Sequence, residues 1–123
     1  MHLAYWMILL AAVLPYVMAG LAKGGGGVDN AQPRVGLEQL QGWRKRADWA
    51  QRNHFEAFPA FAASVFVAEL AHAGQHAIDV LAGLFILFRI GYSVGYIAGR
   101  PAVRSSCWLG GVVCVVALFC IGA

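Results

Sequence analysis

Charged side chains are scarce in this chain. They make up 12% of its 123 residues, against about a quarter in ordinary soluble domains, while 60% of the residues are hydrophobic. The mean hydropathy is correspondingly high, at +0.65. This composition excludes a soluble globular domain and indicates a protein that lies largely within a membrane.

Three further shortages each remove a class of site or function. The three cysteines all lie in the last apolar run, where one straight helix gives them no partner, so no disulfide framework is expected. The run Gly24 to Gly27 follows a helix and lacks a closing Gly-Lys-Ser/Thr, so it is a flexible loop and not a phosphate-binding one. No acidic residue lies in the first apolar run, which argues against a small multidrug transporter that depends on an embedded carboxylate there.

Four apolar runs are each long enough to cross a bilayer, which takes about 20 residues. They predict an all-α protein, with residues 1–123 forming one transmembrane domain and its protomer a four-helix bundle. The expected helices cover about 2–23, 44–73, 76–99 and 102–122, with a cytoplasmic linker at about 24–43. A short amphipathic piece is expected at Leu37 to Trp43.

Basic residues predict the orientation. They gather in or beside the first connection and in the third, at Lys23, Arg34, Arg44, Lys45, Arg46, Arg52, Arg100 and Arg104. Because positively charged loops stay in the cytoplasm, both termini are expected on the non-cytoplasmic side. The short connections fit a multi-pass protein of a bacterial inner membrane. Nothing in the charge pattern suggests nucleic acid as a partner.

The third run carries a polar face. With Arg89 at 0° on a helix, Tyr92 and Tyr96 fall at about 300° and 340°. An arginine in the hydrocarbon layer costs about 2.5–3.5 kcal/mol, so it is normally paired and often marks a site. Glycines recur every fourth residue on the neighbouring face, where they allow another helix to approach closely.

The second run repeats this arrangement, because Arg46, Trp49, Asn53 and Glu56 share one helical face. The acid is expected to pair with the arginine of the third run, either as part of a site or as a purely structural pair. Arg52 and His54 point elsewhere and are expected to face lipid headgroups.

A metal site is not expected. Glu69, His72 and His76 have a helical spacing that could bind a metal. They also flank a short loop on the outer side, where solvated polar residues are the simpler interpretation.

Two motifs together resemble the MAPEG family, the membrane-associated proteins in eicosanoid and glutathione metabolism. The second run contains Asn53-x-x-Glu56-x-Phe58-Pro59. The third contains Arg89-x-x-Tyr92-x-x-Gly95-Tyr96, and an Arg104-Ser105 pair opens the fourth. Both motifs occur in order, with four spans, over essentially the whole chain.

The resemblance implies a homotrimer in the lipid bilayer that binds glutathione as co-substrate between subunits, near the cytoplasmic side. It implies that Arg104 stabilises the glutathione thiolate. The implied glutathione-binding residues are Arg46, Asn53, Glu56, Arg89, Tyr92 and Tyr96. The implied reactions are transfer of glutathione to an apolar electrophile or reduction of a lipid hydroperoxide.

Two positions depart from the family pattern. Trp49 stands where glutathione-binding members commonly have arginine, and Ala57 stands where an aromatic residue often follows the glutamate. The sequence therefore leaves open a catalytically silent trimeric membrane scaffold of the same family.

Overall fold

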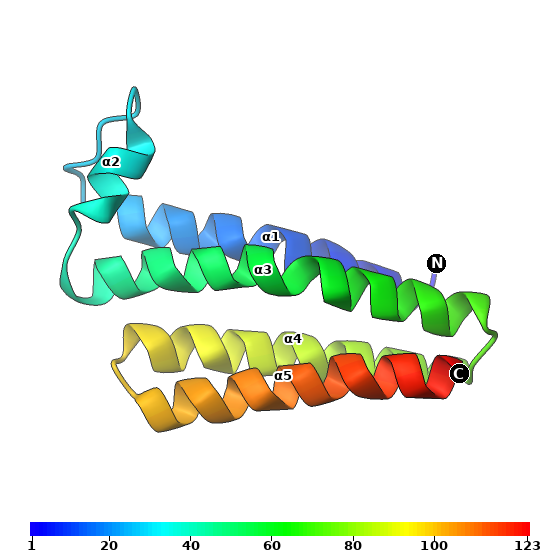
Figure 1. Ribbon diagram of the computed structural model, residues 1–123. Coiled ribbons are helices and arrows are strands. Elements are labelled where there is room, and N and C mark those ends of the chain that lie inside the picture. The colour runs from blue at the N-terminus through cyan, green and yellow to red at the C-terminus, as the bar shows by residue number, and fades with distance from the viewer.

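Most of the chain is helical, and a computed structural model describes residues 1–123. Five helices follow one another with no strand: α1 (Leu3–Lys23), α2 (Pro33–Glu38), α3 (Gly42–Leu70), α4 (Gln75–Ile97) and α5 (Pro101–Gly122). The four long helices lie side by side, while the short α2 stands off at one end (Figure 1). The expected all-α class is thus what the structure shows.

Three of the helices are long and apolar enough to cross a membrane, namely α1, α4 and α5. The sequence predicts four such spans, and α3 does not meet the same criterion. Its first half explains the difference, because the polar segment Arg44 to Glu56 lies inside this 29-residue helix. The same residues that lower its hydropathy are those singled out as a candidate site.

The linker contains a helix that the sequence places wrongly. The short helix covers Pro33–Glu38, earlier than the expected Leu37 to Trp43. Proline at the first helical position supplies a backbone angle that already suits a helix. The chain leaves helical geometry at Leu40 and Gln41, and Gly42 adopts a φ of 65° where α3 begins.

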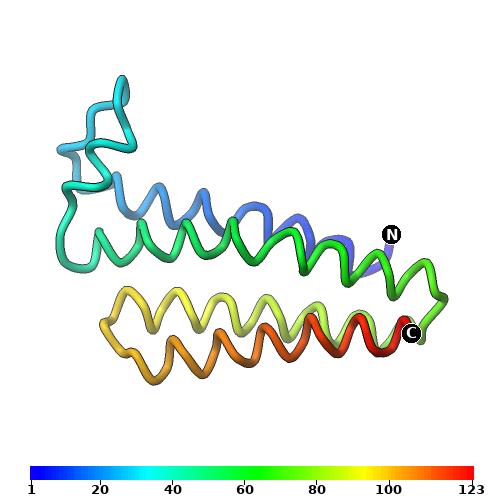
Figure 2. The backbone as a smooth tube through the Cα atoms, viewed as in Figure 1, coloured from blue at the N-terminus to red at the C-terminus, as the bar shows by residue number.

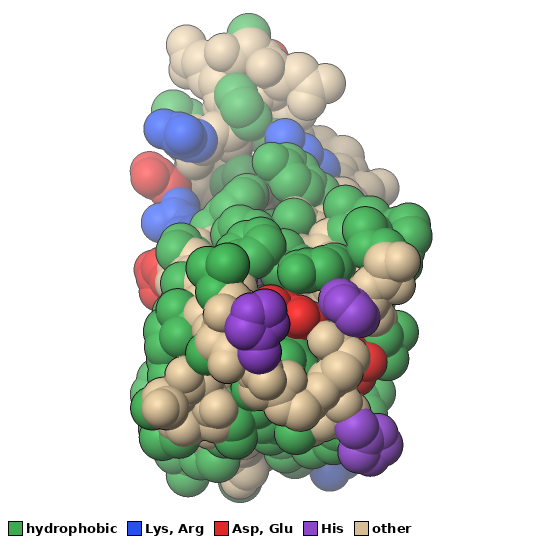
Figure 3. All heavy atoms as spheres, turned by 90° about the vertical axis from the view of Figure 1, so that its right-hand side faces the viewer, with side chains coloured by type: hydrophobic (Ala, Val, Ile, Leu, Met, Phe, Trp, Pro, Cys, Tyr) green, Lys and Arg blue, Asp and Glu red, His purple; other side chains and the backbone are tan.

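Both termini lie at the end of the molecule that also holds the α3–α4 connection (Figure 2). The α1–α3 linker and the α4–α5 connection share the opposite end, so the two basic connections lie together. Histidine and acidic side chains gather on the end with the termini (Figure 3). At this end Gln75 of α4 donates to Glu69 Oε1 of α3 at 2.9 Å, which joins the two helices. It also donates to Asp79 Oδ1 of its own helix at 2.9 Å.

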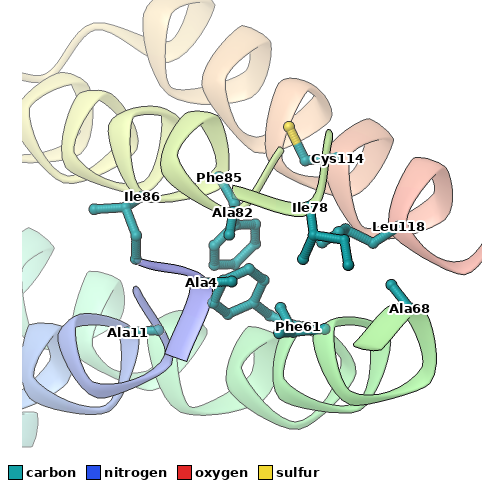
Figure 4. Packing of buried hydrophobic residues seen from close by; sticks show 11 residues of the cluster. Ala4, Ala11, Phe61, Ala68, Ile78, Ala82, Phe85, Ile86, Cys114 and Leu118 are labelled. Carbon is teal, nitrogen blue, oxygen red and sulfur yellow. The ribbon is translucent and has the colours of Figure 1, made fainter. Parts of the chain in front are cut away.

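The largest hydrophobic cluster lies in the half of the molecule nearer the termini. Its centre is a stacked pair, Phe61 of α3 and Phe85 of α4, with ring centroids 3.9 Å apart (Figure 4). Small residues such as Ala4 and Ala11 let α1 approach this pair closely. The other half, between α3, α4 and α5, carries the polar groups described next.

Candidate functional site

Three adjoining cavities lie along the surface where α3, α4 and α5 meet. Their volumes are about 230, 420 and 340 Å³ from the linker end inward. The first two share Trp49 and Tyr96, and the last two share Asn53 and Glu56. We call this continuous surface the groove.

The structure brings every predicted site residue to the groove. The first cavity is lined by Arg46, Tyr96 and Arg104, and the second by Asn53, Glu56, Tyr92 and Tyr96. Arg89 lines the third. Residues that are up to 58 positions apart in the chain (46 to 104) therefore meet on one surface.

The groove changes character along its length. Its linker end is cationic, with Arg46, Arg100 and Arg104 around the first cavity. Its inner end is mostly apolar, and the residues there are Ala57, Ala60, Phe85, Trp108, Gly111, Val112, Val115 and Val116. Glu56 is the only acidic residue that lines any of the three cavities.

Arg104 is held at the start of α5 by a close approach to α4. A Cβ atom on Gly95 would lie 2.9 Å from the backbone nitrogen of Arg104 and 2.9 Å from Cγ1 of Val103. Only glycine permits this contact, as the recurring glycines predict. The Arg104 guanidinium then lies over the ring of Tyr96, 5.0 Å from its centroid.

The chain reverses sharply between these two helices. Gly99 takes a φ of 70°, and Arg100 N–H donates to Gly95 O at 2.8 Å, which is the pattern that commonly ends a helix at a glycine. Pro101 then occupies the first turn of α5. This short connection puts Arg104 one turn into α5, beside the end of α4.

Arg46 is tied to the same end of α4. Its Nε and Nη2 atoms donate to Ile97 O at 3.2 and 2.9 Å. The side chain thereby satisfies a carbonyl that the helix itself leaves free. It lines the first cavity while holding α3 against α4, so its position there is fixed by the fold.

The aromatic residues of the groove pack on one another. Tyr92 and Tyr96 meet edge to face with centroids 5.5 Å apart, and Trp49 lies 6.2 Å from Tyr96. The Arg89 guanidinium lies 4.4 Å from the Tyr92 centroid. Each tyrosine thus has an arginine over its ring, and of these arginines Arg104 lines the first cavity and Arg89 the third.

Arg89 does not pair with Glu56, contrary to the sequence prediction. Arg89 is 2% exposed, and its Nη2 donates to Asn53 Oδ1 at 2.8 Å. Its Nε donates to His54 Nδ1 at 3.1 Å. Glu56 is exposed, and its one side-chain hydrogen bond comes from Asn53 Nδ2 at 3.4 Å. The Glu56 carboxylate, which lines the groove, therefore forms no ion pair with the buried Arg89.

His54 is the residue that sequence reasoning misplaced. It is expected at the headgroups, whereas the structure buries it to 3% exposure between α3 and α4. The spacing of apolar residues in the sequence does predict this burial, because His54 falls on the same helical face as Ala47, Ala50 and Phe61. These three neighbours are completely buried, and so the histidine faces inward with them.

A model of the MAPEG family matches residues 3–123, essentially the whole chain. No curated protein matches the chain.

Proposed function

Because the chain belongs to the MAPEG family, we propose that it is an integral-membrane enzyme that binds glutathione in the groove and activates its thiol. The activated thiol attacks an apolar electrophile or reduces a lipid hydroperoxide. The observation that carries this proposal is the division of the groove into a cationic and an apolar part. One ligand with carboxylates and one apolar ligand fit such a surface side by side.

Glutathione has two carboxylates, one ammonium group and one thiol. The arginines of the first cavity, Arg46, Arg100 and Arg104, complement the carboxylates and the thiolate. Glu56 has no ion pair within the chain and is available for the ammonium group. The charges of the groove therefore match the ligand group by group.

Arg104 is assigned the activation of the thiol. An unperturbed cysteine thiol has a pKa of about 8.5, and only its thiolate is nucleophilic. Lowering that pKa by two units requires about 2.7 kcal/mol of preferential stabilisation of the anion. A guanidinium in a partly desolvated site supplies this, and it does not lose its own proton in doing so.

The two reactions share the thiolate. In conjugation, its sulfur forms a bond to an electrophilic carbon while the leaving group departs with the electron pair. In peroxide reduction, it attacks the terminal peroxide oxygen, and the alkoxide leaves and takes a proton. A second glutathione then converts the sulfenic acid to the disulfide, with release of water.

The protein is proposed to act as a homotrimer in the lipid bilayer. All four long helices then cross the membrane, with the polar half of α3 in contact with glutathione and neighbouring subunits. The inner part of the groove is open, since Trp108 is 45% and Val116 54% exposed. A bacterial inner membrane, with the linker in the cytoplasm, is consistent with the shared position of the two basic connections.

A silent scaffold is the second candidate, and Trp49 is the observation that favours it. Its side chain is 44% exposed and lines both the first and second cavities. An indole there takes up space in which an arginine would contact the tripeptide. On this alternative the groove serves assembly alone.

Turnover assays separate the two candidates. The purified protein in detergent is given glutathione with a chlorodinitrobenzene or with an organic hydroperoxide. We expect turnover in the parent, loss in Arg104→Ala, and parental rates in the control Arg34→Ala, whose exposed arginine lies on α2 away from the groove. Absence of turnover with a range of electrophiles and peroxides supports the scaffold.

A further inference from the structure

A chain of buried hydrogen bonds leads from α4 through His54 into the groove. It begins at Ser93, whose hydroxyl donates to Arg89 O at 3.0 Å. A serine hydroxyl has a single proton, so the Ser93 oxygen acts as the acceptor toward His54 Nε2, 2.6 Å away. The proton on the imidazole is therefore at Nε2.

The hydrogen bonds from Arg89, on the other side of the imidazole ring, require the same tautomer of His54. Its Nε and Nη2 atoms lie 3.1 and 2.9 Å from His54 Nδ1. A guanidinium has donors only, so Nδ1 carries a lone pair and not a proton. Both partners demand the neutral imidazole with its proton on Nε2, and the ring has one consistent state.

The orientation of Asn53 follows from this. Arg89 Nη2 donates to Asn53 Oδ1 at 2.8 Å, so the amide oxygen is turned toward the buried arginine. The amide nitrogen therefore points toward Glu56 Oε2, 3.4 Å away. Asn53 and Glu56 both line the second and the third cavity. At this position the groove is therefore lined by an N–H donor.

We propose that His54 is a positioning residue for the groove. It fixes the Arg89 guanidinium, which in turn fixes the Asn53 amide so that its nitrogen faces the ligand. The group of the ligand that lies against Asn53 is then an acceptor, a peptide carbonyl or a carboxylate oxygen. The identity of that ligand as glutathione rests on the proposed function, whereas the orientation of Asn53 belongs to the chain itself.

Packing alone does not account for this arrangement. An apolar residue at position 54 would fill the same stripe, but it would leave the buried Arg89 without an acceptor on this side. The histidine instead provides an acceptor to Arg89 and a donor to Ser93 on opposite sides of one rigid ring. Rigid support of this kind is what holds binding groups in a productive geometry.

Two amide variants separate positioning from packing. In His54→Asn the side-chain oxygen reaches about the place of Nδ1, so Arg89 keeps its acceptor. In His54→Gln the longer side chain reaches toward Ser93 and the acceptor at Nδ1 is lost. Ser64→Ala is the control, since Ser64 is buried in the same helix and donates only to Phe61 O.

The first measurement is nitrogen NMR of the full-length protein in detergent, with selectively labelled histidine and asparagine. We expect a neutral His54 ring with its proton on Nε2. We expect the side-chain amide signals of Asn53 to be parental in His54→Asn and Ser64→Ala and displaced in His54→Gln. A proton on Nδ1, or unchanged Asn53 signals in His54→Gln, overturns the proposal.

The second measurement is the dissociation constant for glutathione. We expect it to rise about tenfold in His54→Gln and to stay within about twofold of the parent in His54→Asn. Equal weakening in both variants, or none in either, overturns the proposal while leaving the proposed function intact. If the parent binds no glutathione, the proposed function fails, and the amide signals of Asn53 alone decide the role of His54.

Discussion

The guanidinium of Arg104 lies over the ring of Tyr96, 5.0 Å from its centroid, where the last turn of α4 meets the first turn of α5. The cationic group assigned to the thiolate is thus supported by an aromatic face from the preceding helix. Such contacts contribute about 0.5–2 kcal/mol, depending on how far water is excluded.

Replacing Tyr96 tests this support. In Tyr96→Leu the aromatic face is lost, and we expect kcat/KM with glutathione to fall about two- to thirtyfold, the equivalent of that energy. In Tyr96→Phe the face remains, and any loss reports the hydroxyl group alone. Equal activity in Tyr96→Leu and the parent contradicts a supporting role for the ring.

Gly95→Ala tests the close approach that positions Arg104. The added methyl group would lie 2.9 Å from a backbone atom of α5, which has little freedom to yield. We expect a lower melting temperature together with weaker thiolate formation.

The matched control for this variant is Gly83→Ala in the same helix, where the added Cβ meets nothing within 4 Å. Since alanine favours a helix over glycine by about 1 kcal/mol, we expect this control to be neutral or slightly stabilising. A fall in melting temperature of the same size in both variants shows that the contact at Gly95 is unimportant.

Glu56→Gln separates binding from stability. Glu56 makes no ion pair with Arg89, so no buried charge loses its partner when the carboxylate is removed. We expect the melting temperature to stay at the parental value and the dissociation constant for glutathione to rise about tenfold, as for one charged hydrogen bond. Strong destabilisation instead indicates that Glu56 and Arg89 pair in the membrane.

Much of the arrangement is readable from the sequence. The polar faces of α3 and α4 follow from helical spacing, and the structure brings these residues to one groove. The glycines of α4 predict the approach of a neighbouring helix, which the contact between Gly95 and α5 confirms. The family resemblance carried by the two motifs is confirmed by the match over residues 3–123.

The partners of the buried arginine are not readable in the same way. Charge alone selects Glu56 for Arg89, since opposite charges attract at long range. The structure pairs Arg89 with neutral side chains, because His54 lies on the buried stripe of α3 while Glu56 lies on its exposed side. Such a choice depends on how two helices are rotated against each other, and this rotation is set by packing of the whole core.

The proposed membrane span of α3 is a second feature that hydropathy alone does not predict. Its polar first half lowers the average below that of a membrane span, although the helix runs for 29 residues alongside α1, α4 and α5. Hydropathy describes a helix by its composition, whereas some polar groups of α3 are satisfied by partners on another helix, as Arg46 is by Ile97 O.

The measurement that tests the central claim most directly is the near-ultraviolet difference spectrum of the purified protein on addition of glutathione. The account predicts a thiolate band in the parent and in Arg34→Ala, and its disappearance in Arg104→Ala with the oligomeric state unchanged. No band at millimolar glutathione in the parent, or a band that persists in Arg104→Ala, contradicts it.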